Sequence, residues 1–99
     1  MYFLGIDLGS SSIKLAVLDA NTGKSVGSRT VPDHEMIIKA PQSGWAEQDP
    51  QLWWEYTCTG IKKLKHQGVD ISLIKAIGIS YQMHGLVLTD KDLNVLRPS

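Results

Sequence analysis

The chain has 99 residues, and its ten basic and ten acidic side chains cancel to a formal net charge of +0. This length allows one small domain, and the neutral balance gives no electrostatic reason to expect nucleic acid or an anionic membrane as partner. No apolar run is long enough to span a bilayer, and the single cysteine, Cys58, excludes an internal disulfide and fits a reducing compartment. We expect a soluble, cytoplasmic protein.

Three short strands are predicted in the first third of the chain, over residues 2–8, 12–19 and 25–31. The first two are joined by the turn Gly9-Ser10-Ser11, and a second turn at residues 19–24 leads into the third. Three successive strands with such short connections predict an antiparallel meander.

The turn between the first two strands is the first candidate site. Glycine lets the backbone approach a ligand closely, and the consecutive N–H groups of Gly9, Ser10 and Ser11 can form a concavity that binds an anion. Asp7 stands beside this turn, and its carboxylate would reach a phosphate through Mg²⁺. The alternative is a hairpin with an ordinary glycine- and serine-rich turn, in which Asp7 is a solvated strand-end residue.

A helix is predicted after a polar, irregular stretch at residues 32–48. Asp49 is a suitable N-cap, Pro50 fits the first turn and Gly68 supplies the stop. The expected buried face consists of large or apolar side chains at helical spacing, namely Trp54, Cys58, Ile61 and Leu64, widened by Trp53 and Thr57.

Beyond the helix, the pattern predicts a buried strand at residues 75–80, another strand at 85–89, and a turn at 90–92 that leads to a strand at 93–96. A meander, a crossover helix and a strand parallel to the first make up the opening of the ribonuclease H-like α/β fold of actin- and hexokinase-type ATPases. Because no helix closes the pattern, we expect residues 1–99 to be an incomplete first domain.

Met83 and His84 follow the strand at residues 75–80 and form the second candidate site. Ligands of open α/β sheets collect beyond the carboxyl ends of the strands, so these residues would share a crevice with Asp7 if the two strands are neighbours. The histidine can hydrogen-bond a sugar hydroxyl, and the methionine offers an apolar wall. The alternative for His84 is a histidine that satisfies local backbone. Trp45 belongs to a separate motif at residues 45–50, and it is either an aromatic wall near the crevice or a buried loop anchor.

Three motifs in this order resemble the amino end of the FGGY carbohydrate kinases: residues 5–14, 45–54 and 77–85, which together span nearly the whole chain. The resemblance implies an ATP-dependent kinase that transfers the γ-phosphoryl group to a ketose, most closely D-xylulose at its 5-hydroxyl. Ribulose, gluconate and glycerol are alternative acceptors. A non-catalytic sugar-binding module on the same fold is the alternative from another class.

The resemblance also assigns roles to individual residues. Asp7 would help to place Mg²⁺ and the transferred phosphoryl group, while Met83 and His84 would contact the ketose. The residues implied to face the ATP phosphates are Gly9, Ser10, Ser11, Ser12 and Lys14. The family's general base, a downstream aspartate, has no counterpart in this sequence, so we expect the 99 residues alone to be inactive.

The expected partner is a small-molecule sugar, with neither nucleic acid nor membrane. A homodimer is an expectation for the parent enzyme. The segment itself is expected to associate with itself, because a truncated sheet leaves strand edges and an apolar face uncovered.

Overall fold

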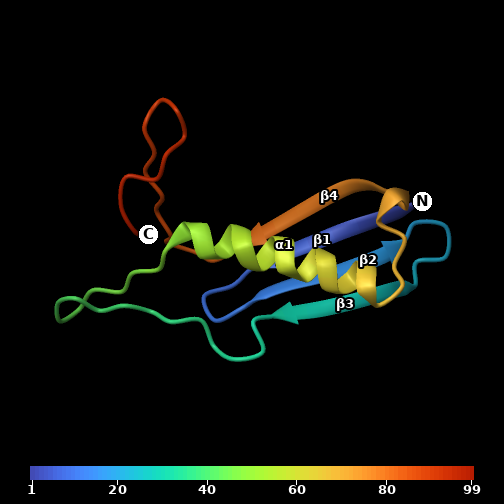
Figure 1. Cartoon of the computed structure of the whole chain (residues 1–99), viewed down its shortest axis with the longest axis horizontal. Helices are drawn as coiled ribbons and strands as arrows, with labels where there is room; N and C mark the ends of the chain where they lie inside the picture. Colours follow the sequence, from blue (N-terminus) through green and yellow to red (C-terminus); the bar gives the residue numbers. More distant parts are fainter.

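The computed structural model describes all 99 residues and contains a four-stranded sheet with one long helix across one of its faces (Figure 1). The elements in chain order are β1 (Tyr2–Leu8), β2 (Ile13–Asp19), β3 (Ser25–Val31), α1 (Pro50–His66), the 3₁₀ turn η1 (Ile71–Leu73) and β4 (Ile74–Tyr81).

The strand order is β3-β2-β1-β4. The pairs β1–β2 and β2–β3 are antiparallel, whereas β4 lies parallel to β1. Since α1 lies between β3 and β4 in sequence, it forms the crossover that parallel pairing requires. The predicted order of meander, crossover helix and parallel strand is therefore confirmed.

The core lies on the face of the sheet that α1 covers, and most of its strand residues come from β1 and β2. Leu4 and Ile6 of β1 and Leu15 and Val17 of β2 are buried because alternate residues of a strand share one face, and that face is the one covered by α1. Leu64 is the fully buried contribution of the helix. The other face of the sheet is open to solvent and carries the odd-numbered residues of β1.

The two ends of α1 lie where the sequence predicts them. The Asp49 carboxylate accepts a hydrogen bond of 2.9 Å from the Gln51 backbone N–H, and Pro50 is the first helical residue. After the helix, Gly68 has a φ of +107°, the left-handed conformation that glycine adopts without steric cost. No helix combines the length and apolar character needed to cross a lipid bilayer.

The buried face of α1 agrees with the predicted one at Thr57 and Leu64, and Trp53 and Ile61 pack against the core, but Trp54 does not belong to it. Thr57, Gly60 and Leu64 face the sheet, while Trp54 is 63% exposed. A Cβ at position 60 would clash with Leu15, so the absence of a side chain there lets the helix approach β2 closely. Sequence periodicity favoured burial of Trp54, but the close approach of the helix at Gly60 turns Trp54 away from the sheet.

The predicted burial of the strand after the helix is wrong. Ile77 and Ile79 of β4 are 59% and 60% exposed. The helix packs on β2 and β3, so β4, at the other end of the sheet, has no layer over it (Figure 1). Hydrophobic content predicted burial, whereas strand order decides which strand is covered.

The two strands predicted at residues 85–89 and 93–96 do not form. Only an isolated bridge joins Thr89 to Val95, around a turn in which the Asp90 N–H donates a 3.0 Å hydrogen bond to the Asn94 carbonyl. The turn prediction at 90–92 agrees with this arrangement. A hairpin that no third strand or helix supports is marginal, which explains why pairing stops at one bridge.

Candidate functional site

Asp7 lies near the end of β1 on the open face of the sheet. Its register partners are Lys14 on β2 and Ser80 on β4, and the Ser80 hydroxyl donates a hydrogen bond of 3.0 Å to the Asp7 carboxylate. Asp7 and Lys14 both line a hollow of about 600 Å³ on this face. The arrangement places a half-buried aspartate and an exposed lysine on neighbouring strands at the entrance to the glycine-serine turn.

The turn after β1 presents unused hydrogen-bond donors. The Gly9 N–H donates to the Ser12 carbonyl at 3.0 Å, and a Cβ at Gly9 would lie only 2.9 Å from that same oxygen. Only glycine therefore fits this tight closure. The backbone N–H groups of Ser10, Ser11 and Ser12 donate no hydrogen bond within the chain, and the first two of these residues are exposed. Three consecutive donors are thus available to an anion.

Met83 and His84 lie in the loop that follows β4. The Gln82 N–H donates to the Leu8 carbonyl at 2.9 Å, so the parallel pairing of β4 with β1 continues to the point where this loop begins. His84 has a φ of +62°, which is uncommon for a residue with a side chain. Met83, His84 and Ser10 line a hollow of about 230 Å³.

The structure divides the predicted site residues into two groups. The strands β1 and β4 are neighbours, as the prediction of a shared crevice required, but Asp7 and Lys14 line the hollow on the open face. Ser10, Met83 and His84 line the other hollow, at the strand ends. The prediction of one crevice is wrong in this respect, because the pleat turns the Asp7 side chain toward the open face.

Gly9, Ser11 and Ser12 line neither hollow, although they belong to the turn that contains Ser10. The Ser11 carbonyl accepts a hydrogen bond of 2.8 Å from the Met36 N–H, which ties the turn to the loop after β3.

Gln48 is a site residue that the sequence analysis did not single out. It is 9% exposed, its Nε2 donates to the Ser10 carbonyl at 2.5 Å, and its Oε1 accepts from Trp53 Nε1 at 3.2 Å. It also lines the hollow of Met83 and His84. The sequence offered one signal, its place within the motif at residues 45–54. No local pattern predicts that a loop glutamine is buried.

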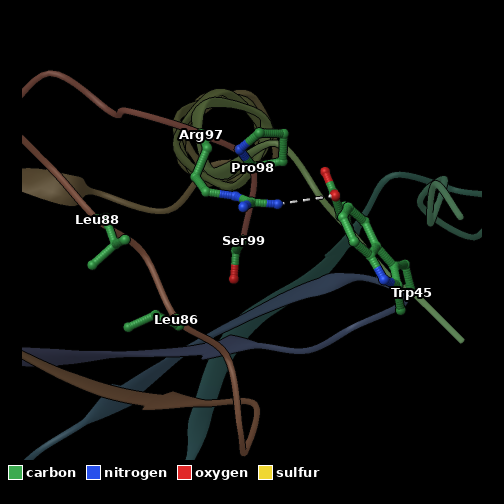
Figure 2. A pocket seen from close by; sticks show the side chains of 8 residues that line it. Trp45, Leu86, Leu88, Arg97, Pro98 and Ser99 are labelled. Atoms are coloured by element: carbon green, nitrogen blue, oxygen red, sulfur yellow. Dashed lines mark hydrogen bonds and ion pairs between the residues drawn. The ribbon is translucent and has the colours of Figure 1, made fainter. Parts of the chain in front are cut away.

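Trp45 forms the wall of a separate hollow of about 390 Å³ (Figure 2). The Arg97 guanidinium lies 6.0 Å from the Trp45 ring centroid and pairs with the Glu47 carboxylate at 3.2 Å. Figure 2 shows Leu86, Leu88 and Pro98 around the same space. With 45% of its surface exposed, Trp45 is an open aromatic wall, so its interpretation as a buried loop anchor is wrong.

The side chains at this site could bind Mg²⁺ only together with a substrate that supplies further ligands. No group of three or more His, Cys, Asp or Glu side chains could hold a metal ion. Asp7 supplies one carboxylate at the turn, and Mg²⁺ is commonly held by one or two carboxylates together with water and substrate phosphates. The residues present therefore suit an ion delivered with a phosphate and do not form a cage of their own.

Comparison with known proteins shows which family the fold and these motifs resemble. Residues 2–99 match the model of the FGGY family of carbohydrate kinases, N-terminal domain. A xylulose kinase from Klebsiella pneumoniae is 43% identical over 99 residues, which cover 98% of this chain and 19% of that protein. The chain thus spans about a fifth of the length of the curated relatives it matches.

Solved structures show the same likeness. A "xyloylose kinase" from Brucella ovis superposes with a TM-score of 0.88 at 37% identity, covering 99% of this chain and 20% of that chain. A gluconate kinase from Lactobacillus acidophilus gives a TM-score of 0.82 at 31% identity, covering 98% and 18%. The predicted fold class, a ribonuclease H-like α/β fold, is confirmed by this agreement.

Proposed function

The chain belongs to the FGGY family of carbohydrate kinases, and on that premise we propose that it is the amino-terminal part of an ATP-dependent kinase acting on a ketose, D-xylulose first, at the 5-hydroxyl. One observation carries the proposal. Ser10, from the turn with three unused N–H donors, lines the same hollow as Met83 and His84. A phosphoryl donor held at the turn and a sugar held in that hollow would be neighbours.

The phosphate side consists of the turn and the two charged residues that precede and follow it. The N–H groups of Ser10, Ser11 and Ser12 would bind phosphate oxygens, and the Lys14 ammonium adds positive charge nearby. Asp7 would hold Mg²⁺, which when bound neutralises phosphate charge. Phosphoryl transfer depends mainly on positioning and charge stabilisation, and this group of residues supplies both.

The sugar side is a small hollow with mixed walls. A volume of about 230 Å³ lies below the roughly 300–1,000 Å³ typical of sites for drug-sized ligands, which suits a small polyol. The His84 ring can donate a hydrogen bond to a sugar hydroxyl or accept one from it, and Met83 offers an apolar surface to the carbon chain of the sugar.

Two alternatives follow from the same features. A kinase for gluconate, ribulose or glycerol would use the same phosphate side with another acceptor, and the solved gluconate kinase at 31% identity supports this possibility. A non-catalytic sugar-binding module would use the hollow of Met83 and His84 but leave the donors of the turn unused.

A titration of the ¹⁵N-labelled chain, followed by NMR, tests the proposal. D-xylulose should shift the amides of Met83–Gly85, and magnesium tripolyphosphate should shift those of Ser10–Ser12. Gluconate and glycerol serve as competing acceptors, and His84→Ala serves as the variant that should lose the sugar response alone. A response to sugar without a response to triphosphate would favour the binding module. Silence toward every ligand would refute the proposed site.

We expect the 99 residues to release no ADP from ATP and sugar, because they form only one wall of a transfer site. Measurable turnover by the purified chain would contradict this expectation.

A further inference from the structure

Gln48 connects the phosphate side of the proposed site with its sugar side. We propose that Gln48 is a positioning residue whose side-chain amide holds the glycine-serine turn and the Met83–His84 loop in one fixed relation. The inference rests on the proposed function and adds to it a residue that acts by holding two segments of the site together.

The two ends of the Gln48 amide serve different segments. Its Nε2 donates to the Ser10 carbonyl at 2.5 Å, so the donor end holds the turn. Its Oε1 accepts from Trp53 Nε1 at 3.2 Å and, more weakly, from Gln82 Nε2 at 3.5 Å, so the acceptor end holds the start of α1 and the residue that precedes Met83. Because the amide is planar and buried, these bonds fix the turn relative to the loop.

The bond to Ser10 also orients a donor that the proposed function uses. The Ser10 carbonyl and the Ser11 N–H belong to one planar peptide unit, so fixing the carbonyl fixes the direction of that N–H. The Ser11 N–H has no partner within the chain. Gln48 thus aims a phosphate donor without contacting the phosphate.

The backbone around Gln48 is anchored independently of its side chain. The Gln48 N–H donates to the Ser99 carbonyl at 2.9 Å, and the Ser99 N–H donates to the Gln48 carbonyl at 2.8 Å. Glu47 makes the same reciprocal pair with Lys39. A side-chain substitution at position 48 therefore removes the link between turn and loop while these backbone bonds keep the segment in place.

Relative placement is what phosphoryl transfer requires, since a misplacement of about 1 Å between reacting groups can cost roughly 10²-fold in rate. A residue that sets the distance from turn to loop would therefore govern catalysis without joining the chemistry.

Two variants distinguish the roles of the donor end and the acceptor end of the amide. ¹⁵N relaxation of the ligand-free chain measures the backbone order of the turn and of the loop. In Gln48→Leu both ends are lost, so order parameters of Ser11–Ser12 and of Met83–Gly85 should fall from about 0.85 toward 0.6. In Gln48→Glu the acceptor oxygens remain but the donor is gone, so only Ser11–Ser12 should loosen. Gln51→Leu, the same substitution at an exposed residue whose side chain makes no hydrogen bond, should change neither segment.

A residue with a merely structural role would not produce this split. If Gln48→Glu loosens both segments, or if Gln48→Leu loosens neither, the proposal is wrong. Unchanged protection of the α1 amides in each variant shows that the chain still folds.

Ligand binding gives the second readout. Saturating D-xylulose should tighten the binding of magnesium tripolyphosphate to the wild-type chain by about fivefold or more, and Gln48→Leu should abolish this coupling while each ligand still binds. Binding of both ligands without coupling in the wild type would overturn the inference. If neither ligand binds, the proposed function fails, and the ligand-free pattern still decides whether Gln48 positions the two segments.

Discussion

The Ser80 hydroxyl donates a hydrogen bond of 3.0 Å to the Asp7 carboxylate, although the two residues stand 73 positions apart in the chain. The parallel register of β1 and β4 makes them direct partners. The strand that leads into the Met83–His84 loop therefore also positions the Asp7 carboxylate.

Asp7→Asn should weaken the binding of magnesium tripolyphosphate by at least about tenfold, because the amide no longer offers a charged oxygen to Mg²⁺. The response of Met83–Gly85 to D-xylulose should be unchanged, since Asp7 does not line that hollow. Because the amide oxygen can still accept the Ser80 bond, the free energy of unfolding should move by no more than ~0.5 kcal/mol. Titration by NMR and urea unfolding measure these effects.

The matched control is Asp92→Asn, an exposed carboxylate in the distant turn at residues 90–92. It should leave triphosphate binding unaltered. If Asp7→Asn binds triphosphate as tightly as the wild type, Asp7 has no part in the phosphate side. Chelation of Mg²⁺ with EDTA should lower wild-type binding to the level of the variant.

Gly9→Ala should lower the free energy of unfolding by about 1–2 kcal/mol and reduce the response of Ser10–Ser12 to triphosphate. The added Cβ would lie 2.9 Å from the Ser12 carbonyl oxygen, so the turn must open. Gly78→Ala is the control, since a Cβ there meets nothing within 4 Å, and its effect should stay within ~0.5 kcal/mol. Equal stability of the two variants in urea would show that the closure at Gly9 is tolerant.

The isolated chain should associate with itself through β4. This strand has an unpaired outer edge, and its Ile77 and Ile79 side chains are more than half exposed, with no charged residue between them. Light scattering after size exclusion should report a species larger than a monomer. Ile79→Lys should shift it toward the monomer, since a charge on an edge strand opposes pairing. Ile37→Lys, at a loop residue that is 72% exposed, should not. A monomeric wild-type chain at every accessible concentration would contradict the prediction.

The turn around Asp90 should loosen in acid. Hydrogen bonds from the backbone N–H and side chain of Asn94, and then from the Asp92 N–H, hold the pKa of Asp90 below its usual range. A carboxylate with a lowered folded-state pKa stabilises the turn above its unfolded pKa of about 3.9. That contribution is lost as the pH falls through the lower, folded-state value. Amide shifts of residues 89–95 should therefore titrate below pH ~4.

Asp90→Asn is the test of that assignment. The variant keeps an acceptor oxygen but has no charge to lose, so its turn should show little dependence on pH in the same range. A wild-type titration that is identical in the variant would assign the transition to another group.

Local pattern was sufficient to predict most of the elements from the sequence. Alternating apolar residues marked β1 and β2, and Asp49, Pro50 and Gly68 marked the ends of α1, because capping and backbone preferences are properties of a few adjacent residues. The motifs around Asp7 and His84 also lead to a prediction of a phosphate side and a sugar side, which the experiments above test.

What the tertiary structure decided depends on the relative placement of the elements. The helix settles on β2 and β3 where Gly60 lets it approach Leu15, which leaves Trp54 and β4 exposed against expectation. The pleat turns Asp7 away from the hollow of Met83 and His84, and only the folded loop brings Gln48 against Ser10. Local sequence encodes backbone geometry over a few residues, whereas burial and long-range hydrogen bonds depend on how distant segments pack.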